Sequence, residues 1–200
     1  ASAWGLARSA RSEAQLQVRC FESSARLACQ HGSEEDEPEL VVRRTVRFVP
    51  RLVRAPEGMQ PEASETQNAG CHLVTGGTAG LGLLTSRWLA QHSASALVLA
   101  SRSGALTTVV AKETALLFAA AVATQVERCD TAEVSHVRRA IGIGHGMPRL
   151  TGVWHAAGVL ADGVLPRQSA ARLARVCGPK AHGGCALELA TARQSLRACV

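Results

Sequence analysis

The chain has 200 residues, enough for one domain or for one domain and part of another, and 46% hydrophobic with 19% charged residues is typical of folded globular proteins. The formal net charge of +6 is typical of proteins that bind nucleic acid. However, the densest arginine stretch, 43–54, is interleaved with apolar residues as in a half-buried strand. Because only 3% of the residues are aromatic and no apolar run has the length of a membrane span, we expect neither a nucleic-acid partner nor a membrane partner.

The first 55 residues predict a small unit of one helix and a few strands. We expect a short helix over 4–16, a strand over 16–21, and one or two strands over 40–54, where Pro50 indicates an edge or a bend. The acidic stretch 31–39 is typical of a solvated loop. Residues 56–69 are polar and contain proline without periodicity, so they predict a linker between residues 1–55 and residues 70–200.

From Cys71 onward, predicted strands and helices alternate. Strands are expected to end at Val74, to run over 96–100, 121–128 and 150–157, and to begin again at Leu196. Helices are expected over 83–91, with Trp88 and Leu89 inward, over 107–119, from Asp130 to Ile141, and over 169–177 and 180–192, which Gly178 and Pro179 separate. This order predicts an α/β fold, a Rossmann-like doubly wound parallel sheet with its ligand at the carboxyl ends of the strands.

A glycine-rich turn follows the first of these strands. Gly76 and Gly80 allow the backbone to turn sharply and to approach a phosphate without an intervening Cβ, and free N–H groups of the following helix face its negative charge. A plain tight turn is the alternative, but strand, turn and helix together favour a site for the pyrophosphate of a dinucleotide. The predicted contacts are Thr75, Gly76, Gly77, Thr78, Ala79, Gly80, Leu81 and Gly82.

The ends of the second and third strands carry further candidates. Ser101 and Arg102 follow the second strand, where an acidic residue would bind the ribose of NAD and an arginine accommodates the 2′-phosphate of NADP. We therefore expect NADPH as the cofactor, with a solvated loop arginine as the alternative. Cys129 and Asp130 follow the third strand. Asp130 either hydrogen-bonds the adenine amine or caps the next helix, since Asp130-x-x-Glu133 resembles a capping box.

The end of the fourth strand carries the small residues Ala156, Ala157 and Gly158, which let the backbone pass close to the sugar of the cofactor. His155 precedes them. Imidazole titrates near neutral pH and is suited to catalysis, but a lone histidine at the end of a buried strand is more often simply packed, and we expect that here. Lys180 is one of two lysines; taken alone it predicts a surface residue at a helix start, and Lys112 keeps that interpretation.

The seven cysteines show no pairs at the spacing of zinc sites or disulfide frameworks, so we expect no metal site. Reduced, mostly buried thiols favour an intracellular, cytoplasmic location. The N-terminus lacks an initiator methionine and the features of a signal peptide, and looks like a cut inside a longer chain.

These segments together resemble one family. T-G-G-T-A-G-L-G, L-V-L-A-S-R-S-G, C-D, H-A-A-G-V-L-A-D-G-V-L and G-P-K-A-H-G are similar to the ketoreductase domain of modular polyketide synthases, in the short-chain dehydrogenase/reductase superfamily. W-G-L-A-R-S-A-R-S-E is similar to the late part of the family's structural subdomain, and R-F-V-P-R-L-V-R resembles the strand that leads out of it. The resemblance implies part of a truncated Rossmann-like structural subdomain over 1–55, then the first part of the NADP-binding catalytic subdomain over 70–200, with its sheet incomplete at the C-terminal end.

The resemblance also implies an activity. It is the NADPH-dependent reduction of a β-ketoacyl group, carried as a phosphopantetheine thioester on an acyl carrier protein, within a polypeptide that holds other synthase domains. In the family a tyrosine donates the proton, a serine holds the carbonyl oxygen, and a lysine positions the ribose and lowers the pKa of the tyrosine. Lys180 lies where these ketoreductases place that lysine, so the resemblance implies a catalytic role for it.

The chain contains no tyrosine, and the serine, tyrosine and asparagine of the family would lie past Val200. We therefore expect a fragment that does not reduce ketones at an enzymatic rate by itself. A non-catalytic remnant that keeps the fold and binds NADPH is one alternative. A stand-alone short-chain reductase is another, disfavoured by the residues before the linker.

One segment bears on stereochemistry. Leu160-Ala161-Asp162 lies where the B-type enzymes of the family carry Leu-Asp-Asp, a motif linked to the D-configured alcohol. Asp162 matches the last acidic position, while Ala161 departs from the pattern. The resemblance implies a B-type enzyme with Asp162 in stereocontrol, with a solvated loop aspartate as the alternative.

Overall fold

A computed structural model describes residues 2–23, 37–44, 46–54, 70–92, 94–106, 111–142 and 147–200. They belong to two compact units: unit 1 comprises Ala1–Pro61 with Asp162–Gln168, and unit 2 comprises Glu62–Ala161 with Ser169–Val200. The linker predicted at 56–69 and most of the acidic loop predicted at 31–39 lie outside the described residues. The return of Asp162–Gln168 to unit 1 is not evident from the sequence.

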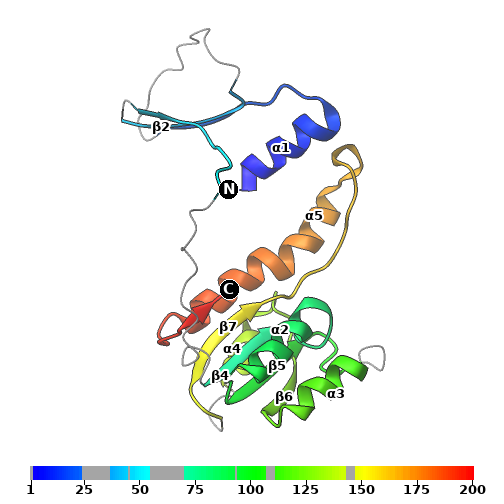
Figure 1. Ribbon diagram of the computed structural model, residues 1–200. Helices are drawn as coiled ribbons and strands as arrows, with labels where there is room; N and C mark the ends of the chain where they lie inside the picture. The colour runs from blue at the N-terminus through cyan, green and yellow to red at the C-terminus, as the bar shows by residue number, and fades with distance from the viewer. Residues whose placement is uncertain are drawn as a thin grey trace. The chain divides into compact units, whose positions relative to one another are not determined.

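Unit 2 is built on a parallel five-stranded sheet (Figure 1) with the order β6-β5-β4-β7-β8. The strands are β4 (Cys71–Thr75), β5 (Ala96–Ser101), β6 (Ala123–Arg128), β7 (Leu150–His155) and β8 (Ala198–Cys199). The helices are α2 (Gly80–Gln91), α3 (Ala111–Ala119), α4 (Val134–Gly142), α5 (Ala170–Cys177) and α6 (Gly183–Thr191), with a π-helical turn, η5 (Gly178–His182), between the last two. The strand order reverses between β4 and β7, which is where such sheets bind ligands. The predicted Rossmann-like fold is confirmed.

Helices cover both faces of this sheet. On one face Leu73 packs in a cluster with Val137 of α4 and Leu187 of α6. On the other face Leu97 packs in a cluster with Leu89 of α2. All five residues of β4 and the first five of β5 are buried, as expected for central parallel strands covered on both sides.

Three predictions about the elements of unit 2 are wrong. Trp88 is 44% exposed, and its indole stacks on the ring of His92 with the centroids 4.5 Å apart, whereas Leu89 is buried as predicted. Asp130 does not open a helix, because α4 begins at Val134. Gly178 and Pro179 do not separate two helices. Gly178 has right-handed helical φ and ψ, and the backbone continues from α5 through the π turn into α6.

Unit 1 contains a helix and a small sheet. The helix is α1 (Ser2–Ala14), and the strands are β1 (Cys20–Ser23), β2 (Glu39–Arg43) and β3 (Val46–Phe48). β1 and β2 are parallel, and β2 and β3 are antiparallel. β1 begins four residues later than predicted, since residues 16–19 are not in a strand. Among the described residues, no helix of either unit is long and apolar enough to cross a membrane.

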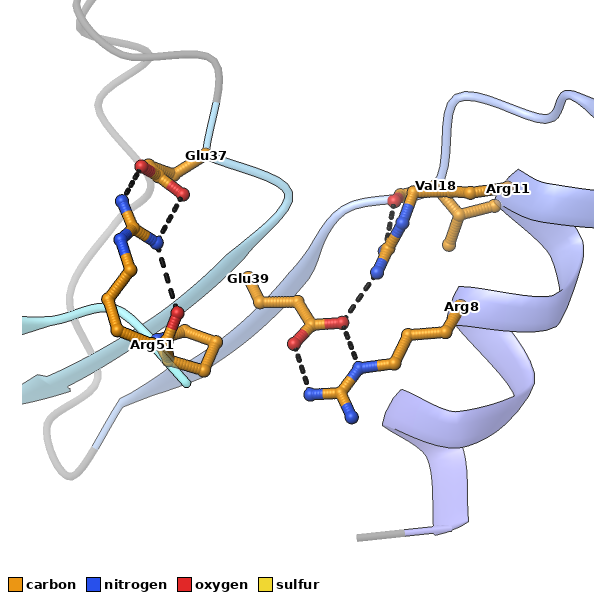
Figure 2. A network of polar contacts seen from close by, with 7 residues as sticks. Arg8, Arg11, Val18, Glu37, Glu39 and Arg51 are labelled. Carbon is orange, nitrogen blue, oxygen red and sulfur yellow. Dashed lines mark hydrogen bonds and ion pairs between the residues drawn. The ribbon is translucent and has the colours of Figure 1, made fainter. Parts of the chain in front are cut away.

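A buried carboxylate joins α1 to β2 in unit 1 (Figure 2). Glu39 is only 4% exposed and accepts two hydrogen bonds from the Arg8 guanidinium, at 2.7 and 2.6 Å, and another from Arg11. Arg11 also donates to the carbonyl of Val18 at 2.9 Å. The hydrogen bonds from Arg8 are the largest cause that lowers the pKa of Glu39 to about 2, so this carboxylate stays ionised in all but strongly acidic solution.

The segment Asp162–Gln168 also packs within unit 1. It contains a short 3-10 helix, η4 (Leu165–Arg167), whose first backbone N–H donates to the Glu13 carboxylate of α1 at 2.6 Å. This hydrogen bond satisfies an N–H that a helix start leaves without a backbone partner.

Candidate functional site

A pocket of about 760 Å³ lies in unit 2, at the carboxyl ends of β4, β5, β6 and β7. Its size is within the usual range for a site that holds a small molecule or cofactor. The residues predicted from the sequence that line it are Gly76, residues 78–82, Ser101, Arg102, Cys129, Asp130, residues 156–158 and Lys180. The fold therefore brings together segments that lie far apart in the sequence, from Gly76 to Lys180.

The glycine turn after β4 has the conformation that its sequence predicts. Gly76 and Gly80 have φ of 68° and 51°, in the left-handed region that side chains disfavour. The N–H of Gly76 donates to the carbonyl of Ala100 in β5 at 2.7 Å, which fixes the turn to the sheet. Helix α2 begins at Gly80 without a side-chain cap, so first-turn N–H groups remain available to an anion.

Two of the predicted turn contacts, Thr75 and Gly77, do not line the pocket. Gly77 is needed for packing, because a Cβ there would lie 2.7 Å from the carbonyl oxygen of Val74 and 3.2 Å from the Cα of Leu99. Thr75 is buried, and its hydroxyl accepts a hydrogen bond from the N–H of Ala157 at 3.3 Å. These two residues support the turn without lining the pocket.

Arg102 lines the pocket from the end of β5. Its neighbour Ser101 is occupied with the local turn, where its hydroxyl accepts from the N–H of Gly104 at 3.1 Å. Arg102 itself is exposed and forms no hydrogen bond or ion pair with any other residue that the structure describes. Its guanidinium is therefore free to pair with an anionic group in the pocket.

The end of β6 contributes Cys129 and Asp130. Burial raises the pKa of the Cys129 thiol to about 11, so it remains protonated and is unsuited to act as a nucleophile. Asp130 accepts a hydrogen bond from the N–H of Ala132 at 3.0 Å, two residues ahead. The bond to the N–H of Glu133 that a capping box requires is replaced by one from Glu133 to the backbone carbonyl of Asp130.

His155, at the end of β7, is half-buried and contacts other residues through both ring nitrogens. Its Nδ1 lies 2.7 Å from the hydroxyl of Thr75, and its Nε2 lies 3.3 Å from the carbonyl oxygen of Lys180. The side chain of Lys180 extends over Gly158. A Cβ at Gly158 would be 2.9 Å from Cε and 3.4 Å from Nζ of the lysine. The absence of a side chain at Gly158 thus leaves room for the ammonium in the pocket.

Some predicted and observed site residues differ. Asp162, predicted for stereocontrol, does not line the pocket and belongs to unit 1. The pocket also includes Ser103, Thr131, Val159, Leu160 and Pro179, which were not predicted to line it. Ser103, Thr131, Val159 and Leu160 continue the predicted post-strand segments by one or two residues, and Pro179 directly precedes the predicted Lys180.

Comparison with known proteins agrees with this geometry. Residues 70–200 match the family model of the KR domain. The chain belongs to the KR domain family. It is 36% identical over 199 residues to the spectinabilin polyketide synthase system protein NorA of Streptomyces orinoci, an alignment that covers 96% of this chain and 10% of that protein.

Solved ketoreductases have the same fold. The structure of an A1-type ketoreductase matches with a TM-score of 0.82 at 27% identity, over 98% of this KR chain and 43% of that chain. PlmKR1, the ketoreductase from the first module of phoslactomycin biosynthesis in Streptomyces sp. HK803, matches with a TM-score of 0.80 at 27% identity, over 94% of this chain and 45% of that chain. The KR chain thus spans less than half of each solved ketoreductase. The resemblance to polyketide synthase ketoreductases is confirmed.

Proposed function

We propose that this KR chain forms the NADPH-binding part of a ketoreductase that reduces a β-ketoacyl thioester, held on an acyl carrier protein, to the β-hydroxyacyl thioester. Membership of the KR family implies a nicotinamide cofactor. The observation that carries the proposal is the pocket, in which a glycine turn, an uncapped helix start and a free arginine meet at the switch point of a parallel sheet. Other synthase domains in the same polypeptide are the expected neighbours.

The residues that line the pocket fit a dinucleotide. Gly76 and the start of α2 offer backbone N–H groups for the pyrophosphate, and Arg102 offers its guanidinium for the 2′-phosphate. Asp130 keeps one carboxylate oxygen for the adenine amine, since the bond to Ala132 uses the other. The backbone of residues 156–158 leaves space for a ribose beside Lys180. When bound, NADPH would supply the hydride.

Lys180 is the residue of this chain that we place in the chemistry. Its ammonium lies beside Gly158 in the pocket, where it would hydrogen-bond the hydroxyls of a ribose and favour an anion nearby. No tyrosine occurs in the 200 residues, and the proposal assigns none of them as the proton donor. Cys129 and His155 have structural roles in this scheme.

Stereocontrol and location are further parts of the proposal. The B-type part of the proposal rests on the resemblance of the Leu160-Ala161-Asp162 segment alone: of these residues Leu160 lines the pocket, whereas Asp162 does not. Of the six cysteines in the described residues only Cys71 and Cys129 are buried, so the prediction of mostly buried thiols is wrong. All six are free thiols, and this supports a reducing compartment, the cytoplasm.

Arg102→Ala tests the cofactor assignment. The substitution should weaken the binding of NADPH by about 1–3 kcal/mol, roughly 5- to 150-fold in affinity. It should leave the binding of NADH nearly unchanged, because only NADPH carries the 2′-phosphate. Titration of the fluorescence of each reduced cofactor measures both affinities. Arg138→Ala is the matched control, since Arg138 is exposed on α4 and does not line the pocket. Equal losses for the two cofactors would contradict the phosphate assignment.

A further inference from the structure

The π turn that carries Lys180 is held from the side by two polar side chains. In this turn the N–H of Gly183 donates to the carbonyl of Gly178, five residues earlier, in the π-helical pattern. The hydroxyl of Thr131 donates to the carbonyl of Pro179 at 3.4 Å, and Nε2 of His155 lies 3.3 Å from the carbonyl oxygen of Lys180. These two carbonyls belong to the peptide groups on either side of the Lys180 Cα, so together the contacts restrain both of its backbone dihedrals.

The donors and acceptors around His155 can be assigned from their chemistry. A carbonyl oxygen only accepts, so Nε2 must carry the proton that it donates to Lys180. The hydroxyl of Thr75 accepts from the N–H of Ala157, and its own hydrogen is then free to point at Nδ1 of His155, 2.7 Å away. The imidazole therefore connects the glycine turn after β4 to the π turn.

The packing around Gly183 agrees with this arrangement. A Cβ at Gly183 would lie 2.8 Å from the hydroxyl of Thr131 and 3.3 Å from Cε1 of His155, so both side chains lie directly against the end of the π turn. On the pocket side of the same turn, the Lys180 side chain extends over Gly158. The direction of the ammonium is thus tied to the backbone that these two side chains contact.

We propose that Thr131 and His155 are positioning residues for Lys180, which fix the π turn so that the ammonium lies over Gly158. The role assigned to Lys180 rests on the proposed function; the restraint on the π turn does not. Neither residue needs to touch the substrate. A purely structural pair would stabilise unit 2 as a whole, whereas a positioning pair acts locally on residues 178–183 and on Lys180.

The test uses His155→Phe, which keeps a ring of similar size without polar atoms, and Thr131→Val, which removes only the hydroxyl. Thr191→Val is the matched control. It also removes a buried hydroxyl bonded to a backbone carbonyl, that of Leu187 at 2.8 Å, but it lies in α6 and does not line the pocket. Amide hydrogen exchange in the folded protein should accelerate by about 2- to 10-fold at 178–183 in the first two variants and not in the control.

A second measurement follows the ammonium itself. Because the chain has only two lysines, exposed Lys112 serves as an internal reference for acylation by a small amine-reactive probe, read by mass spectrometry. NADPH should protect Lys180 relative to Lys112, and His155→Phe should reduce that protection by about 2- to 10-fold while NADPH still binds. His155→Gln, whose amide provides one donor and one acceptor, should restore part of it. In the native polypeptide kcat should fall with little change in the KM of the thioester.

The outcomes separate the two proposals. Unchanged exchange at 178–183 and unchanged protection in His155→Phe and Thr131→Val would overturn the positioning role, as would equal changes in Thr191→Val. If NADPH does not protect Lys180 in the unaltered protein, the proposed function of Lys180 fails, and hydrogen exchange still decides whether the pair restrains the turn.

Discussion

The two units of this KR chain are held together by different forces. The central strands of unit 2 are buried on both faces, and their apolar side chains form two clusters, one on each side of the sheet. In unit 1 the strands are short, and Phe21, Val46 and Phe48 are 48%, 53% and 51% exposed. The most buried side chain of its β2 is charged, Glu39. Apolar burial dominates unit 2, and a network of ions joins the elements of unit 1.

The difference explains where a precise site is formed. Close packing leaves side chains in a parallel sheet little freedom, so the turns that follow its strands are held within narrow limits. All the residues that line the pocket belong to unit 2. Unit 1 orders its sheet through long arginine side chains, which can reach a partner from many positions and so define a backbone less tightly.

Removing a core side chain from each unit should give the largest contrast. Leu97→Ala, at a fully buried position of β5, should cost about 2–5 kcal/mol of unfolding free energy in unit 2. Val46→Ala, at a half-exposed position of β3, should cost less than about 0.5 kcal/mol in unit 1. Urea unfolding followed by pulsed hydrogen exchange measures each unit separately. Similar losses at both positions would remove the distinction between the units.

The next effect concerns the chemistry assigned to unit 2. Lys180→Met should lower the turnover of the native polypeptide by about 100-fold, roughly 2.7 kcal/mol, because a charge that favours the transition state is lost. Lys112→Met changes the only other lysine, which lies on α3 outside the pocket, and should leave turnover unchanged. Assays with a β-ketoacyl thioester and NADPH measure both. A fully active Lys180→Met protein would exclude this residue from the mechanism.

The same contrast accounts for what the sequence could predict. The strands of unit 2 follow from continuous apolar runs, such as 96–100, because burial on both faces leaves an unambiguous pattern. The glycine turn follows from its spacing, since left-handed φ at Gly76 and Gly80 requires that residue type. In unit 1 the predicted start of β1 is wrong, because a half-exposed strand of four residues leaves a weaker periodic signal.

The remaining errors come from contacts that no local pattern contains. Pro179 lacks an N–H and suggested a helix break, but a π turn accommodates it, with carbonyls bonded by Thr131 and His155 from other segments. Those partners lie 48 and 25 residues from the carbonyls they contact, so only the folded chain reveals them. Trp88 is the exception, because the ring it stacks on, that of His92, is only four residues further along the chain, at the i,i+4 spacing of a helix.

The smallest predicted effect tests the ionic half of the comparison. Glu39 has an ordinary pKa of 4.5, lowered to about 2 in the folded chain first by the hydrogen bonds from Arg8 and also by those from Arg11. A carboxylate with a lowered pKa stabilises the fold above its unfolded pKa, and loses this contribution as the pH falls through its folded pKa. The free energy of unfolding of unit 1 should therefore fall as the pH is lowered from about 4.5 to 2. The apolar clusters of unit 2 contain no carboxylate of this kind.

Glu39→Gln should remove this particular pH dependence, because the amide has no charge to lose, and it should weaken unit 1 at neutral pH, since Arg8 and Arg11 lose their common partner. Urea unfolding at pH 7 and pH 3, read by pulsed hydrogen exchange in α1 and β2, measures the change. Glu22→Gln is the control: its carboxylate pairs with Arg43 but is 52% exposed, so solvent screens the pair and little should change. If Glu39→Gln and Glu22→Gln behave alike, buried charge does not hold unit 1 together.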